Sequence, residues 1–181
     1  MKRRAERGFT LVEIMIVVAI IALLAAIAIP NVLRGRTAAN ESSSIGNLRA
    51  LVSSLEMVRT VNLTYPALET WQATMYGTDC LAATAPVPDF GPPSFCTADL
   101  NAGAGAPPAG SQVQGYTYNY TGAAAPAQTY TITAVPVVVN STGTRSFFLD
   151  ESGVIRHELG ITGATVGCPA IDQAPAADAT C

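Results

Sequence analysis

Several residue types that carry chemistry are scarce in this chain. Its 181 residues include one histidine, one lysine and four cysteines. Only 13% of the residues are charged, about half of the roughly 25% that is typical. So few imidazoles and thiols leave little material for chemistry, and we expect no enzyme activity, no cofactor and no metal. The low charge excludes charge-driven disorder, and the net charge of −3 excludes a broadly basic nucleic-acid binder.

One long apolar run contributes much of the 49% hydrophobic content. The sixteen residues from Ile14 to Ile29 carry no polar or charged side chain, and back to Phe9 only Thr10 and Glu13 interrupt the run. About twenty predominantly apolar residues are enough for a helix to cross the hydrocarbon of a bilayer. The eight residues ahead of the run carry net charge +3. The positive-inside tendency therefore predicts a cytoplasmic N-terminus and an exported remainder.

Three kinds of N-terminal segment are compatible with this run. The first kind is a cleaved signal peptide, with the small residues 26–28 as its cleavage site. Two features count against it: residues 29–30 (Ile-Pro) would follow the cut, and Glu13 would lie inside the apolar segment. The second kind is a signal anchor that is never cleaved. The third is a short basic leader, residues 1–8, that is cut after Gly8 and leaves the apolar helix on the mature chain. We favour the third because of Glu13.

Glu13 is the unusual residue of the apolar run. A carboxylate near the middle of a spanning helix costs on the order of 2.5–3.5 kcal/mol, and less near the interface. One interpretation places Glu13 at the headgroups, because it lies only about 7 Å along the helix from Gly8. The other requires cleavage after Gly8, which creates a positive α-amine on Phe9. In a parallel bundle, Glu13 of one subunit then meets this amine of a neighbour, and such a pair can fix their stagger.

Residues 7–13, Arg-Gly-Phe-Thr-Leu-Val-Glu, and the apolar run that ends at Pro30 resemble the class III signal of type IV pilins and pseudopilins. The resemblance covers residues 1–30. It implies cleavage after Gly8 by a prepilin peptidase, N-methylation of Phe9 and a role for Glu13 in subunit docking. It also implies a homo-oligomeric helical filament, assembled by an inner-membrane platform and its ATPase.

An amphipathic pattern continues beyond the apolar run. Its apolar residues recur at three- and four-residue steps, which predicts one buried helix face: Ile45, Leu48, Leu51, Val52, Leu55 and Val58. Residues 9–60 therefore read as one helix, of which 9–29 span the membrane and later form the filament core. We expect this face to cover a sheet of the same chain, since too few heptads are present for a coiled coil. Pro30 and Gly35 weaken the helix, so we expect a bend between them. The remaining charged residues are expected to be solvated: Arg34, Arg36, Glu41 and Glu56.

Residues 61–181 are expected to form an exported head. Residues 61–115 are rich in proline and glycine and read as a long loop with a short helical turn near 68–75, anchored by aromatic residues. Strand patterns follow at 116–120, 129–139, 144–149 and 153–158, with a hairpin turn at 150–153 and with Pro136 indicating an edge or a bulge. Three or four antiparallel strands packed on the long helix make an α+β fold. Residues 143–156 resemble the sheet hairpin of pilin-like proteins.

The four cysteines all lie in the expected head: Cys80, Cys96, Cys168 and Cys181. An even count in an oxidising compartment predicts two disulfides, with three possible connectivities. We favour Cys80–Cys96 with Cys168–Cys181, because each closes a local loop and contributes about 3 kcal/mol. A zinc site is the rival, but no CxxC spacing is present and His157 is the only imidazole. We expect His157 to lie at the surface or at a sheet edge.

The preferred function is a structural subunit, a pilin of a type IV pilus. It is held by lipid in the inner membrane and then moves into an extracellular filament that serves adhesion, motility or DNA uptake. Beyond residue 60, two basic residues stand against nine acidic ones, so we expect no nucleic-acid partner. A type II secretion pseudopilin is the first alternative, placed second because the head is long and Asp150 and Glu151 read as turn residues without a calcium loop. An uncleaved, membrane-anchored binding module is the alternative of another class.

Overall fold

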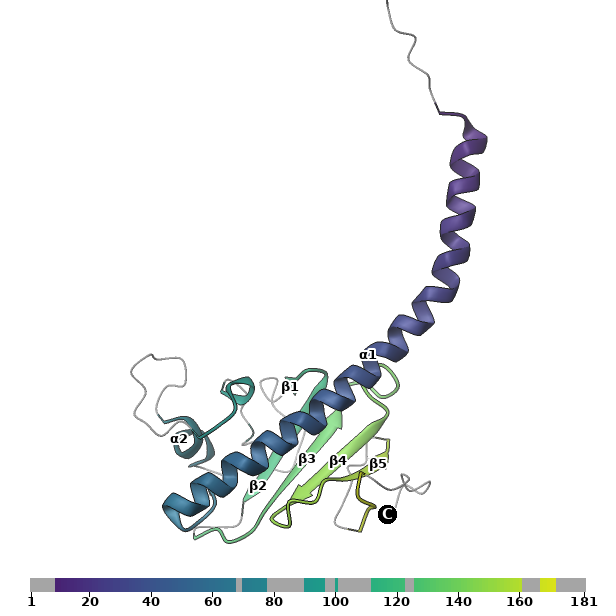
Figure 1. The fold of residues 1–181 in the computed structure, drawn as a ribbon. Helices are drawn as coiled ribbons and strands as arrows, with labels where there is room; N and C mark the ends of the chain where they lie inside the picture. The colour runs from purple at the N-terminus through teal and green to yellow at the C-terminus, as the bar shows by residue number, and fades with distance from the viewer. Residues whose placement is uncertain are drawn as a thin grey trace, which may run out of the picture. The chain divides into compact units, whose positions relative to one another are not determined.

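The computed structural model describes most of the chain (Figure 1). The described residues are 9–67, 70–77, 90–96, 100, 112–122, 126–160 and 167–171. Two units can be distinguished within the chain, residues 1–36 and residues 37–181. The 52-residue helix α1, Leu11–Asn62, runs through both units. Its length confirms the single long helix that the two apolar patterns predict.

The first half of α1 is helical through two residues that disfavour a helix. The helix continues through Pro30 and Gly35 without a break. Proline has no amide hydrogen, and its ring crowds the carbonyl of the preceding turn. The missing amide of Pro30 leaves the carbonyl of Ala26 without its helical donor, and the next side chain, Asn31, donates Nδ2 to the carbonyl of Ile27 at 3.1 Å. The expected bend between Pro30 and Gly35 stays a prediction.

The head is an antiparallel sheet beneath the second half of α1, which confirms the predicted α+β fold (Figure 1). The sheet has five strands in sequence order: β1 Gln112–Val113, β2 Tyr116–Gly122, β3 Tyr130–Pro136, β4 Arg145–Asp150 and β5 Arg156–Leu159. Two short helices precede it, α2 Trp71–Tyr76 and the 3-10 helix η2 Pro93–Phe95. The strand β1 was not predicted, because two residues are too few to leave an alternating pattern. The helix α2 confirms the expected helical turn.

Turn chemistry sets the register at both ends of the sheet. Gln114 and Gly115 connect β1 to β2 with φ values of 51° and 81°, as a tight two-residue hairpin requires. After β4, Ser152 donates its amide to Asp150 Oδ1 at 2.9 Å, and the Gly153 amide donates to the Asp150 carbonyl at 3.0 Å. These bonds confirm the predicted turn, although β5 begins later than expected, at Arg156.

The interpretation of Pro136 as a marker of an edge strand or a bulge was wrong. Pro136 is the last residue of β3, which is the central strand, and it pairs with Tyr116 of β2. The pairing of β3 with β4 ends two residues earlier, at Ala134. A proline is tolerated there because it removes a donor where the second ladder has already ended.

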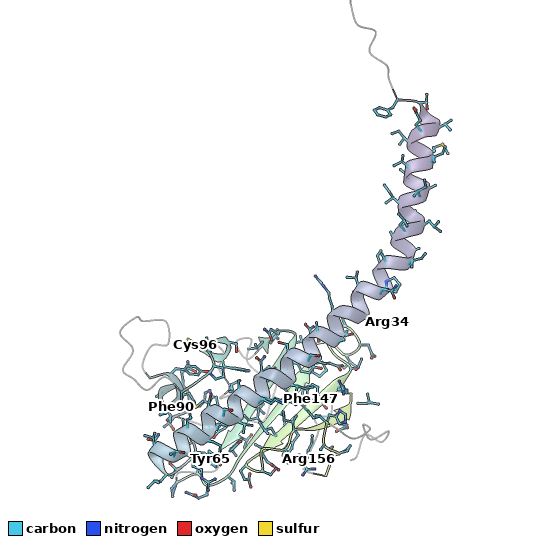
Figure 2. The ribbon with its side chains drawn as sticks, viewed as in Figure 1. Arg34, Tyr65, Phe90, Cys96, Phe147 and Arg156 are labelled. Carbon is cyan, nitrogen blue, oxygen red and sulfur yellow. The ribbon has the colours of Figure 1, made fainter. Side chains whose placement is uncertain are left out.

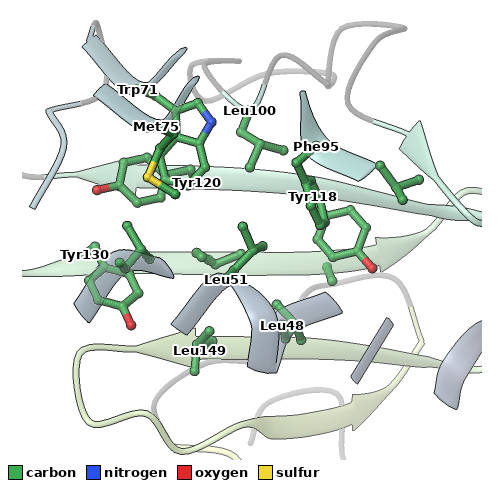
Figure 3. Close-up of a cluster of buried hydrophobic side chains, with 14 of the residues drawn as sticks. Leu48, Leu51, Trp71, Met75, Phe95, Leu100, Tyr118, Tyr120, Tyr130 and Leu149 are labelled. Atoms are coloured by element: carbon green, nitrogen blue, oxygen red, sulfur yellow. The ribbon is translucent and has the colours of Figure 1, made fainter. Parts of the chain in front are cut away.

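The core lies between the sheet and α1. Four predicted helix residues, Leu48, Leu51, Leu55 and Val58, are fully buried, and Ile45 and Val52 are partly buried against the same cluster. Figure 3 shows Leu48 and Leu51 among aromatic side chains that come from the strands and from the short helices. The ring of Trp71 lies 4.3 Å from that of Tyr120, and the ring of Phe95 lies 4.8 Å from that of Tyr118.

The C-terminal segment covers the other side of β4. Ser146 and Phe148 point away from the helix and are still buried, and Phe148 packs on Cys168. This segment lies along β5, where the amide of His157 donates to the carbonyl of Pro169 at 3.0 Å. Cys96 and Cys168 are both disulfide-bonded. The expected partners, Cys80 and Cys181, lie outside the described residues, so the pairing stays a prediction.

We predict that Leu51→Ala lowers the free energy of unfolding by about 2–5 kcal/mol, because it leaves a cavity in a fully buried position. Urea unfolding of the full chain in detergent micelles, followed by the fluorescence of the single tryptophan, Trp71, measures this change. Met57→Ala is the matched control, since Met57 lies on the same helix and is 50% exposed. Equal stabilities for the two variants would contradict the assigned core.

Candidate functional site

The N-terminus of α1 holds two residues of the expected docking site. Thr10 donates its amide to Glu13 Oε2 at 2.8 Å, and its hydroxyl donates to the same oxygen at 2.7 Å. In return, the Glu13 amide donates to Thr10 Oγ1 at 3.2 Å. This reciprocal arrangement is a capping box, which satisfies backbone donors that the first turn of a helix leaves unpaired. Thr10 precedes the helix, and Glu13 lies in its first turn.

The capping box gives Glu13 a role that the sequence interpretation missed. The signal was present as Thr-x-x-Glu at residues 10–13, ahead of an apolar run. Both hydrogen bonds from Thr10 to the Glu13 carboxylate use one oxygen, Oε2. A carboxylate has two oxygens and several acceptor positions, so Oε1 can accept a donor from outside the chain. Phe9, the other expected docking residue, is 85% exposed beside it.

The apolar part of α1 is exposed among the residues that the structure describes. Figure 2 shows its side chains standing out around the whole helix. Fourteen large apolar side chains between residues 9 and 29 are 51–85% exposed: Phe9, Leu11, Val12, Ile14, Met15, Ile16, Val17, Val18, Ile20, Ile21, Leu23, Leu24, Ile27 and Ile29. Exposing this surface to water would cost on the order of 10–20 kcal/mol. By length and composition this part of the helix can cross a membrane. Lipid or other protein must therefore cover it.

A second polar site joins α1 to the sheet. Glu41 Oε1 accepts hydrogen bonds from the Thr144 amide at 2.8 Å and from its hydroxyl at 2.5 Å. Glu41 Oε2 accepts from Arg145 Nε at 2.9 Å and forms an ion pair with Nη2 at 2.7 Å. Both carboxylate oxygens are therefore occupied, in the two-pronged geometry that arginine forms with carboxylates. We call Glu41, Thr144, Arg145 and His157 the Glu41 cluster.

The prediction that Glu41 is solvated was wrong, because Glu41 is only 7% exposed. It extends the buried stripe of Leu48 and Leu51 back along the helix through Ser44, at the same three- and four-residue steps. A polar residue in register with an apolar stripe is a signal for a buried partner, which the sequence interpretation did not use. Glu56 differs, since it is exposed, although it accepts a hydrogen bond from Tyr65 at 2.7 Å.

His157 lies on β5, an edge strand of the sheet, which is one of the two places expected for it, but it is not at the surface. His157 is 1% exposed and pairs across the sheet with the core residue Phe147. Its spacing of two from the buried Ile155 puts both on the core side of the sheet. Arg145 Nη1 lies 3.2 Å from His157 Nδ1. Arginine can only donate, so Nδ1 is the acceptor of this hydrogen bond.

The Glu41 cluster holds its carboxylate ionised. Burial raises the pKa of the Glu41 carboxyl, but the hydrogen bonds from Thr144 and the hydrogen bond and charge of Arg145 outweigh burial and lower that pKa below its usual value. Burial also raises the pKa of the neighbouring Tyr116, whose hydroxyl donates to the Arg145 carbonyl at 2.8 Å. The cluster is therefore a charged contact between α1 and the sheet within the head.

Other expected sites are only partly described. Within the described ranges no three His, Cys, Asp or Glu residues gather closely enough to hold a metal ion. Asp150 uses Oδ1 to accept hydrogen bonds from Ser152, as a turn residue does. The leader and its cleavage residue, Gly8, lie outside the described residues, so cleavage and methylation stay predictions.

Comparison with known proteins places similarity at the N-terminal end. Residues 3–29 match the family described as the prokaryotic N-terminal methylation motif. The type II secretion system core protein G of Pseudomonas aeruginosa is 38% identical over 69 residues, which are 38% of this chain and 49% of that protein. The protein of the same name from Vibrio cholerae is 35% identical over 68 residues, 38% of this chain and 47% of that protein. The matched region thus spans about half the length of these relatives. No solved structure matches.

We predict that Glu41→Gln lowers stability at neutral pH by roughly 3 kcal/mol, because it leaves the Arg145 charge poorly paired. A lowered folded-state pKa stabilises the protein above the usual carboxyl pKa of 4.5, and this contribution is lost as the pH falls through the folded-state pKa. The wild type should therefore lose stability from about pH 5 downward, and the variant should lack this part of the loss.

Urea unfolding at several pH values in detergent measures both effects. Glu151→Gln, at an exposed turn position, is the control and should behave as the wild type. An unchanged pH dependence in Glu41→Gln would contradict an ionised Glu41 that is stabilised by folding.

Proposed function

Because this chain belongs to the family of type IV pilins and pseudopilins, we propose that it is a pseudopilin, a structural subunit of a periplasmic filament that serves type II secretion. The similar proteins carry the name type II secretion system core protein G, and this observation carries the proposal. This similarity favours the type II secretion pseudopilin, which was the first alternative, over the pilin of a surface pilus, which the sequence analysis preferred. The family is structural.

Processing starts the proposed cycle. A prepilin peptidase removes residues 1–8 and with them the net charge of +3 that holds the N-terminus in the cytoplasm. The cut creates an α-amine on Phe9, next to the capping box. The mature subunit keeps the apolar part of α1 in the inner membrane, while the head stays in the periplasm.

Assembly then moves the helix from lipid into a bundle of parallel helices. Lipid tails are as apolar as leucine, so this exchange gains little from hydrophobic burial alone. The polar groups of the segment must therefore decide how subunits align. Within residues 9–29 these groups are Thr10, Glu13 and the new amine of Phe9.

The capping box prepares Glu13 for this alignment. Two donors of Thr10 hold Oε2 and fix the carboxylate at the start of the helix. Oε1 is then oriented before a neighbour arrives, so little side-chain entropy is lost when the neighbour's Phe9 amine binds. The pair fixes the stagger of adjacent helices, because any other register would leave a charge unpaired in low dielectric.

A surface pilus is the second candidate. The similarity to the secretion proteins covers only 38% of this chain. The head also has disulfide bonds at Cys96 and Cys168, which would suit a filament exposed to the medium.

Deletion of the gene in the source bacterium separates the two candidates. A pseudopilin predicts that enzymes normally found in the medium accumulate in the periplasm while surface pili remain. Loss of sheared surface filaments with normal secretion would overturn the pseudopilin in favour of the pilus.

We predict that the mature protein begins at Phe9 and carries one added methyl group. Intact-mass spectrometry of the protein extracted from membranes measures both features. A Gly8→Trp variant should keep its leader, because the residue before the cut becomes bulky, and serves as the reference for the uncleaved chain. A wild-type protein that begins at Met1 in cells with an active prepilin peptidase would support an anchored binding module.

We also predict that Glu13→Ala is exported normally but enters filaments at least about tenfold less well, since an unpaired buried amine costs on the order of 3 kcal/mol. Glu13→Gln keeps an oxygen for the cap but loses the charge, and should fail as strongly. Thr10→Val keeps the charge but loses the hydroxyl, and should assemble with an intermediate yield. Crosslinked filaments from cells that express each variant give the yields. Normal assembly of Glu13→Gln would show that capping alone is required.

A further inference from the structure

Two arginines lie at the exported end of the membrane-spanning segment, where the positive-inside tendency disfavours basic residues. Arg34 and Arg36 follow the apolar run on the exported side, within seven residues of its end at Ile29. Basic residues close to a spanning helix are concentrated on the cytoplasmic side. Between Glu13 and Glu41 the sequence has no acidic residue, so these arginines give this segment a net charge of +2.

The side chain of Arg36 can reach the depth of lipid phosphates. It follows Ile29 by seven residues, which is about 10 Å along a helix. The polar headgroup layer on each side of the hydrocarbon is about 5–7 Å thick. A helical side chain leans toward the N-terminus of its helix, and the long arginine stem lets the guanidinium reach back by several ångströms. The exposed Arg36 therefore brings its charge into the headgroup layer.

Arg36 also lines a hollow on the helix surface. The hollow has a volume of about 210 Å³ and is lined by Ala28, Ile29, Val32, Leu33 and Arg36. These residues repeat at steps of three and four and so share one face of α1. The small side chain of Ala28 lets the surface dip. The site is thus apolar on the membrane side, with one guanidinium at its exported end.

We propose that this hollow holds one anionic phospholipid of the periplasmic leaflet, with its phosphate on Arg36 and the upper part of an acyl chain against Ala28, Val32 and Leu33. A guanidinium matches a phosphate with two parallel hydrogen bonds. The proposal rests on the membrane-held state of the proposed function, and it adds a ligand that the subunit must release or carry with it when it leaves the bilayer.

A second copy of the chain fits the hollow less well. Residues 14–40 of a neighbour offer no carboxylate to Arg36. The next acid of a copy in similar register is Glu41, whose two oxygens are already occupied by Thr144 and Arg145. A lipid phosphate supplies the missing negative charge, whereas a copy in register would add another arginine.

The test compares lipid binding in membranes of two compositions. The full mature chain is reconstituted into nanodiscs of phosphatidylcholine mixed equally with phosphatidylglycerol, and native mass spectrometry counts the lipids that stay bound on release. We expect the wild type to retain phosphatidylglycerol preferentially. Arg36→Gln should lower this preference about fivefold, which is the contribution of one arginine near an anionic surface. Arg36→Lys should keep part of it, because the charge remains while the paired hydrogen bonds are lost.

Arg49→Gln is the matched control, because Arg49 is an exposed arginine of the same helix, thirteen residues or about 20 Å of helix length beyond Arg36. It should leave the lipid preference unchanged. An equal loss in Arg49→Gln, or no loss in Arg36→Gln, would overturn the proposal. Loss of crosslinks between copies in Arg36→Gln with an unchanged lipid preference would overturn it in favour of a second copy.

Flotation with pure phosphatidylcholine vesicles separates this test from the proposed function. Wild type and Arg36→Gln should both float, since the apolar helix inserts without a specific lipid. If the chain floats but shows no preference for phosphatidylglycerol, only the proposed lipid site is contradicted. If the chain does not float, the proposed membrane-held state is contradicted as well.

Discussion

A helix that is apolar on every side cannot stay in water, and the rest of this molecule depends on that constraint. The large apolar side chains between residues 9 and 29 are exposed in the described part of the chain. In the proposed function a bilayer covers them first and other helices cover them later. The transfer between these two apolar surroundings changes the hydrophobic energy little. The energy that orders the subunits therefore has to come from the few polar groups that the segment carries.

Those polar groups are placed at the ends of the apolar segment, each by a local bond of the helix. Thr10 and Glu13 close the first turn as a capping box. Near the other end, Asn31 bonds the carbonyl of Ile27 next to Pro30. The capping box satisfies backbone and carboxylate groups that lipid would leave unpaired. The same groups are then oriented for a neighbour or for a headgroup.

The head is held to the same helix by two kinds of contact. Leu48, Leu51 and Leu55 bury the helix on the sheet, and this packing supplies most of the stability. Glu41 fixes the register of the helix on the sheet, because its two oxygens can accept hydrogen bonds from Thr144 and Arg145 in only one register of helix and strand. An apolar interface alone would tolerate small shifts along the helix. The ion pair thus defines where the helix leaves the head.

The sequence by itself determined the long helix, its buried stripe and the α+β fold. These follow from periods of two and three to four residues, which are local properties of the chain. Only the tertiary structure decided that Glu41 and His157 are buried and that Pro136 ends a central strand. Glu41 is buried by residues about a hundred positions away in the sequence, and Pro136 is tolerated because the pairing of β3 with β4 has already ended. Neither fact can be predicted from a local sequence pattern. The capping box was readable as Thr-x-x-Glu, but its oxygen-by-oxygen bonding required coordinates, because a carboxylate's partners depend on side-chain geometry.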